Sequence, residues 1–125
     1  MPANLVTSFQ ISSNEVIWQI ASDNSNTAEG TNFLTSSATT RPQHVLTPSL
    51  LQLFEGGDLR KSQWINKNTV GGIDYYYPAK YKVRTSTPIS EFNIALRLAE
   101  VYLIRAEAHS RLNHFPEACY DLNQE

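Results

Sequence analysis

Five aromatic side chains gather in the middle of the sequence, where they could contact a ligand that has apolar faces. They are Trp64, Tyr75, Tyr76, Tyr77 and Tyr81. Aromatic rings stack on apolar surfaces such as the faces of sugar rings, and their polar edges hydrogen-bond to hydroxyls. In a strand, Tyr75 and Tyr77 would share one face and Tyr76 the other, so at least one of the three should be buried. Two interpretations stay open: these aromatics form a core, or one or two of the first four bind a ligand.

The carboxylates of the sequence lack a catalytic pattern. Glu100 and Glu107 would share one face of a helix at a separation of about 10.5 Å by helical rise, which is too wide for a retaining glycosidase pair. Arg97 and Arg111 would lie on the same face, and Glu107 and Arg111 form an i,i+4 pair, so ion pairing is the expected role. The chain has no nucleophile elbow, HExxH sequence or Gly-rich phosphate loop. We therefore expect neither an enzyme nor a cofactor.

Composition excludes further classes of protein. The 125 residues carry 12 acidic and 10 basic side chains, for a net charge of −2. Because these charges are interspersed and form no basic patch, we do not expect binding to nucleic acid. No apolar run is long enough to span a membrane, and the start lacks the pattern of a signal peptide. The single Cys119 is interpreted as a buried helix thiol, and the spacing of His109 and His114 does not indicate a metal site.

The most regular stretch of the sequence is Ser90–Leu112, which contains good helix formers and neither Gly nor Pro. It predicts one long helix that is capped by Ser90 and followed by Asn113 in the left-handed region. Only a narrow strip of this helix is polar, so we expect neighbours on most of its sides. Pro116 suits the first turn of a second helix.

The segments before this stretch are short. Extended segments rich in β-branched and aromatic residues are predicted at 16–20, 62–67, 73–77 and 80–83, with a turn at 68–72. A helix begins at Thr47–Pro48 and ends at the glycines Gly56 and Gly57. The polar stretch 22–41 is predicted as loop. The predicted fold class is mainly α: an α+β chain with a long C-terminal helix pair, short strands that include a hairpin, and long loops.

The helix pair has the pattern of a tetratricopeptide unit, in which two helices follow each other across a tight turn. With Ala118 as the small residue of the second helix, Tyr102 falls at an aromatic position and Ala106 at a small one. His109 departs from the pattern, because an aromatic residue is usual there.

Beyond this general pattern, RLAEVYLIRAEAHSRLN (97–113) followed by FPEACYDLN (115–123) strongly resembles the C-terminal signature of the SusD/RagB family. The residues that carry the signature are Arg97, Glu100, Tyr102, Arg105 and Glu107. Weaker features agree at Asn14–Trp18, at Asp58-Leu59-Arg60 and at Lys80-Tyr81. In the family, Asp58 and Arg60 would mark a conformational junction, whereas from the residues alone they form a local salt bridge at a helix exit.

The resemblance implies a surface-exposed outer-membrane protein of Bacteroidetes-type bacteria. Such a protein binds a glycan, oligosaccharide or other nutrient without catalysis, and a partner TonB-dependent porin of the SusC type imports it. Its lipid anchor would lie upstream and is absent from this chain. Residues 1–125 would then be a partial domain, with a loop-rich region at 1–89 and a truncated helix pair at 90–125. The alternative is a tetratricopeptide-type module for protein–protein interaction.

Overall fold

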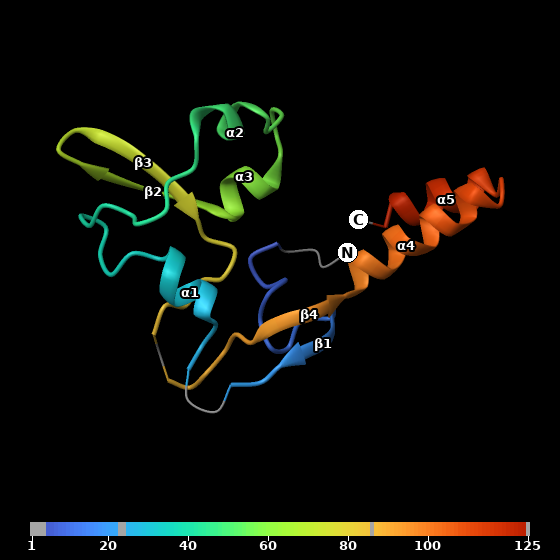
Figure 1. Ribbon diagram of the computed structural model, residues 1–125, viewed down its shortest axis with the longest axis horizontal. Helices are drawn as coiled ribbons and strands as arrows, with labels where there is room; N and C mark the ends of the chain where they lie inside the picture. Colours follow the sequence, from blue (N-terminus) through green and yellow to red (C-terminus); the bar gives the residue numbers. More distant parts are fainter. Residues whose placement is uncertain (1–4, 23–24, 86, 125) are drawn as a thin grey trace.

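A computed structural model describes residues 5–22, 25–85 and 87–124, in which five helices and four strands are formed. In chain order they are β1 (Val16–Ile20), α1 (Ala28–Phe33), α2 (Pro48–Gln52), α3 (Leu59–Gln63), β2 (Ile65–Val70), β3 (Ile73–Pro78), β4 (Asn93–Arg97), α4 (Leu98–Arg111) and α5 (Phe115–Leu122). Figure 1 shows α4 and α5 extending as a pair from the end of β4, away from the remaining elements.

The prediction of a mainly α fold is wrong, because the chain is α+β with about 32% helix and 19% strand. The difference is largest in the predicted helix Ser90–Leu112, whose first part is β4. This strand pairs antiparallel with β1, in a register that places Gln19 opposite Ile94. Pairing with a distant strand here overrides local helix propensity. Ser90 is consequently no helix cap, and Arg97 takes the N-cap position without a side-chain hydrogen bond.

The predicted hairpin is confirmed as the antiparallel pair β2–β3, with Asn68 opposite Tyr75. Its turn is shorter than predicted and consists of Gly71 and Gly72, whose φ values are 60° and 79°. These left-handed angles favour glycine. The strand predicted at 62–67 starts later, because α3 occupies its first residues, and 80–83 forms no strand.

Helix ends follow capping chemistry. The predicted start at Thr47–Pro48 is confirmed, since the Thr47 hydroxyl accepts a hydrogen bond from the Leu50 amide at 3.3 Å. Helix α2 ends at Gln52, before the predicted glycines. The predicted loop 22–41, of which 23–24 lie outside the described residues, contains α1. Asn113 has a φ of 61°, as predicted for the residue after α4.

Buried apolar residues of the described chain are mostly small: Phe9, Tyr77, Ala79, Ala99, Ala106 and Ala118. The interpretation of Cys119 as a buried thiol is wrong, because it is exposed and the buried positions of α5 are Ala118 and Asp121. Within the described ranges, no helix combines the length and apolar character needed to cross a membrane.

Candidate functional site

The three hairpin tyrosines have different surroundings, as strand alternation predicts. Tyr77 is buried, with 6% of its surface exposed, and its hydroxyl donates to Asn68 Oδ1 at 3.4 Å. Tyr75 is half-buried, and the Arg41 guanidinium carbon lies 5.0 Å from its ring centroid. Tyr76 is 36% exposed on the opposite face. The hairpin therefore offers Tyr76, and part of Tyr75, to a ligand, while Tyr77 supports the fold.

Trp64 is half-buried and belongs to an aromatic cluster with Phe9 and Tyr81. Its indole Nε1 donates to the Leu5 carbonyl at 3.0 Å. Its ring packs edge-on against the Phe9 ring, with 5.5 Å between the ring centroids. The Tyr81 ring packs against the same Phe9 ring, with 5.3 Å between the centroids. This arrangement favours the core interpretation for Trp64. Phe9, at the centre of the cluster, was not identified from the sequence, because the N-terminal segment has no pattern that distinguishes it.

Two cations lie over this cluster. Lys80 Nζ is 5.0 Å from the Phe9 ring centroid and 5.3 Å from that of Trp64. Arg97 Cζ is 5.5 Å from the Phe9 centroid. Lys80 follows β3 and Arg97 ends β4, so two separate parts of the chain bring the positive charges to one aromatic residue.

A cavity of about 310 Å³, here called the cationic cavity, opens beside these two side chains. Aromatic and charged residues dominate its wall: Phe9, Glu29, Phe33, Lys80, Tyr81 and Arg97. A second cavity, also of about 310 Å³, shares Lys80 and Pro78 with the first. The second cavity is otherwise mostly apolar, with Trp64 and Arg60 in its wall. Lys80 and Pro78 therefore separate two neighbouring hollows.

Among the described residues, the cations of the cationic cavity, Lys80 and Arg97, contact aromatic rings but form no ion pair. Burial, followed by the positive charge of Arg97, lowers the pKa of Lys80. Glu29 lines the same cavity, and its buried Oε2 has no hydrogen-bond partner in the described part of the chain. Lys80 is exposed and Arg97 and Glu29 are half-buried, so these charged groups are available to a ligand at the cavity.

The loop that carries Lys80 is held by a buried carboxylate. Glu91 is 1% exposed, and its oxygens accept from the Lys82 amide at 2.8 and 3.0 Å and from the Val83 amide at 3.0 Å. The Asn26 side-chain oxygen accepts in turn from the Glu91 amide at 3.1 Å. Because a carboxylate that accepts several amide hydrogen bonds fixes the backbone around it, this network holds the loop at Lys82 and Val83, just after Lys80. Sequence reasoning missed both Glu91 and Asn26.

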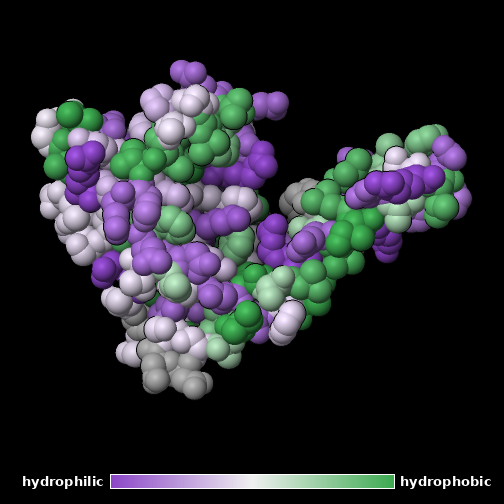
Figure 2. Space-filling view, viewed as in Figure 1, coloured by the Kyte–Doolittle hydropathy of each residue, from purple (hydrophilic) through white to green (hydrophobic). Residues whose placement is uncertain are grey.

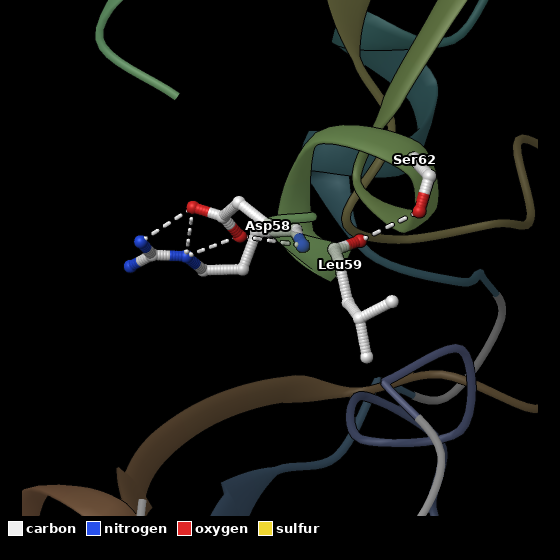
Figure 3. Close-up of polar contacts among 4 residues, drawn as sticks. Asp58, Leu59 and Ser62 are labelled. Atoms are coloured by element: carbon white, nitrogen blue, oxygen red, sulfur yellow. Dashed lines mark hydrogen bonds and ion pairs between the residues drawn. The ribbon is translucent and has the colours of Figure 1, made fainter. Parts of the chain in front are cut away.

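Asp58 and Arg60 form the predicted local salt bridge, at the entry of α3 rather than at a helix exit. Asp58 caps the helix by accepting from the Arg60 amide at 2.9 Å, and the two side chains meet at 2.7 Å (Figure 3). The Arg60 side-chain hydrogen bonds lower the pKa of Asp58. The salt bridge thus orders the first turn of α3, and a conformational junction stays a prediction.

Three signature residues of α4, Tyr102, Arg105 and Glu107, take part in contacts of the helix pair. Arg105 Nε and Nη2 donate to the buried Asp121 carboxylate at 2.7 and 2.6 Å, which joins α4 to α5. The Arg105 guanidinium carbon also lies 5.2 Å from the Tyr102 ring centroid. The predicted Glu107–Arg111 pair is confirmed at 2.6 Å. Sequence reasoning missed Asp121, because a single Asp in a short helix gives no signal of a partner sixteen residues earlier.

Arg97 does not share a helix face with this pair as predicted, because it ends β4, whereas Glu100 does, seven residues before Glu107 on α4. Glu100 is exposed in the first turn of α4. His109 and His114 lie with ring centroids 5.9 Å apart. Within the described ranges, no group of three or more His, Cys, Asp or Glu side chains could hold a metal ion.

Comparison with known proteins connects this arrangement to a family. Neither the curated proteins nor the solved structures contain a match to the chain. The family comparison matches residues 49–124 to the SusD family. The match runs from α2 to the end of α5 and includes the hairpin, Lys80 and the helix pair, whereas Asn14–Trp18 lies outside it. Because this match covers more than half of the sequence, the chain belongs to the SusD family.

Proposed function

We propose that the chain is a non-catalytic glycan-binding protein that acts in nutrient uptake at the cell surface. The observation that carries the proposal is the family match over residues 49–124. Proteins of this family are binding proteins rather than enzymes, and the family points to glycan uptake at the cell surface. A binding role also agrees with a surface that combines aromatic rings with open cavities.

The finer steps extend the same proposal. The chain would hold oligosaccharide beside a TonB-dependent porin of the SusC type, at an outer membrane to which a lipid anchor attaches the whole protein. Within the chain, the helix pair would act as a scaffold and contact the porin. The sugar would contact the hairpin side of the molecule, where Tyr76 is the most exposed of the three tyrosines.

Affinity electrophoresis of the chain in gels that contain different polysaccharides tests this proposal. We expect at least one glycan to retard the chain, and Tyr76→Ala to reduce the retardation severalfold through loss of stacking. Tyr120→Ala is the matched control, because Tyr120 is an exposed tyrosine on α5, outside the hairpin. Equal retardation of both variants would exclude Tyr76 from the site.

An interaction module for proteins is the second candidate, and the exposed apolar side chains of α4 and α5 favour it. They include Val101, Leu103, Ile104, Phe115 and Leu122. If no polysaccharide in the gels retards the 125-residue chain, the proposal that it binds a glycan fails. Protein interaction then becomes the leading function.

A further inference from the structure

We infer that the cationic cavity binds the anionic group of an acidic sugar, a carboxylate or a sulfate ester, between Lys80 and Arg97. This inference rests on the proposed glycan-binding function and narrows its ligand to a chemical class.

The first argument is the placement of the two cations. Lys80 Nζ and Arg97 Cζ lie 5.0 and 5.5 Å from the centroid of the same Phe9 ring, and both line the cavity. Like charges that line one cavity repel each other, and after burial the positive charge of Arg97 is the second cause that lowers the pKa of Lys80. With no carboxylate paired to either within the described chain, an anion from outside would relieve the repulsion and gain charge-assisted hydrogen bonds.

The second argument is the polarity of the cavity. Glu29 lines it together with Lys80 and Arg97, so the wall carries charges of both signs. Burial raises the pKa of Tyr81, and among the smaller causes the charge of Glu29 raises it and that of Arg97 lowers it. The ligand that fits has its negative group at Lys80 and Arg97, which both line the cavity. Its hydroxyl donors face Glu29, whose Oε2 has no hydrogen-bond partner in the described chain.

The third argument is size and surface. A cavity of about 310 Å³ is at the small end of the usual range for ligand sites, about 300–1,000 Å³. It therefore suits one sugar unit better than a chain. Phe33 and Tyr81 supply aromatic surface for the apolar side of the ring. The second cavity continues on the other side of Lys80 and Pro78, where a neighbouring unit could lie.

Isothermal titration of the full 125-residue chain tests the inference with three probes. They are an oligogalacturonate, which carries carboxylates, a chondroitin sulfate oligosaccharide, which adds sulfate esters, and maltohexaose, which is neutral. We expect binding of an acidic probe to weaken about tenfold or more in Lys80→Met and in Arg97→Gln, because each removes a charge-assisted hydrogen bond. Lys61→Met is the matched control, since exposed Lys61 on α3 is outside both cavities.

The outcomes separate the inference from the function on which it rests. The inference is supported if an acidic probe binds tightly to the unaltered chain and loses affinity in Lys80→Met and Arg97→Gln but not in Lys61→Met. The acidic probe that binds more tightly then shows whether the cavity prefers a carboxylate or a sulfate ester. Maltohexaose that binds as well as the acidic probes, with no effect of Lys80→Met, overturns the inference but leaves glycan binding intact. Binding of no probe overturns it, and the polysaccharide gels then decide the wider function.

A measurement on the unaltered chain covers the case in which a variant fails to fold. Affinity for the acidic probe must fall as sodium chloride rises, because salt screens the attraction between charges. An affinity that is independent of salt overturns the inference without any variant. Thermal melting of Lys80→Met and Arg97→Gln, followed by circular dichroism, establishes which variants are folded.

Discussion

At the residue scale, the position of Gly30 admits no side chain, because α1 and the backbone of Val83 approach each other closely there. It is buried in α1, and a Cβ atom at this position would lie 2.3 Å from the Val83 carbonyl oxygen. The obstacle is backbone, which cannot swing aside as a flexible side chain can. The Gly30 amide also donates to the Thr27 hydroxyl at 3.0 Å, which caps α1. The Thr31 hydroxyl donates to the Arg84 carbonyl at 3.3 Å, which joins α1 to the loop that follows Lys80.

Replacing Gly30 by Ala should therefore destabilise the chain by about 1–3 kcal/mol, as overpacking does elsewhere. Urea unfolding followed by circular dichroism measures the loss. Gly56→Ala is the matched control, because nothing lies within 4 Å of its Cβ position, and it should be neutral or stabilise by about 0.4–1 kcal/mol. Equal stability of the two variants would mean that α1 and the Val83 loop separate readily.

The hairpin tyrosines show how far single residues can be predicted. Alternation correctly separates Tyr76 from Tyr75 and Tyr77, because side-chain direction in a strand has a period of two. Which face is covered depends on the loop at 35–40. The Asn68 side-chain nitrogen holds this loop by donating to Thr35, Ser37 and Thr40 at 3.0, 2.9 and 2.7 Å. No local pattern in the sequence specifies that contact.

At the scale of elements, an ion pair between the buried Asp121 and the exposed Arg105 joins α4 to α5. The hydrogen bonds from Arg105 lower the pKa of Asp121. A carboxyl group whose pKa is lower in the folded chain stabilises the fold above its ordinary pKa near 3.8, and the contribution disappears as the pH falls through the lowered value. The pair should therefore loosen on acidification.

We expect Asp121→Asn to lower the melting temperature at pH 7 by several degrees and to flatten the decrease in melting temperature between neutral pH and pH 3. Thermal melts followed by circular dichroism at a series of pH values measure both effects. Glu107→Gln is the control, because its pair with Arg111 is exposed on one helix and such pairs contribute about 0.2–1 kcal/mol. If the melting temperature of Asp121→Asn depends on pH as strongly as that of the unaltered chain, the Arg105–Asp121 ion pair is not the cause of the acid sensitivity.

Helix starts, turns and helix ends are predicted well where the preferences of one or two residues determine them. The Thr47–Pro48 start, the glycine turn of the hairpin and the break at Asn113 all follow from single-residue preferences. The start of α4 does not, because 93–97 has helix-forming residues and becomes strand only by pairing with β1, more than seventy residues earlier. Helices α1 and α3 were missed, since five or six residues are too few to show a helical period.

At the scale of the whole molecule, the α4–α5 pair exposes much of its apolar surface. Figure 1 shows that the pair projects from the body, and Figure 2 shows apolar surface along it. Large side chains on the pair are substantially exposed, among them Leu103 at 46%, Ile104 at 59% and Phe115 at 57%. The expectation of neighbours on most sides of the helix is therefore unmet within the described chain. Extended apolar patches of this kind promote association.

We expect the chain to self-associate through this pair. Sedimentation velocity over a range of concentrations should show a shift toward dimers or larger species, because burying apolar side chains releases about 25 cal/mol per Å². Ile104→Lys should reduce the shift. Ile73→Lys should not, since Ile73 is equally exposed, at 58% against 59%, but lies beside the hairpin turn of the body. A compact monomer that melts cooperatively at every concentration would mean that the pair tolerates an exposed apolar surface without a partner, and the case for protein interaction through α4 and α5 would lose its support.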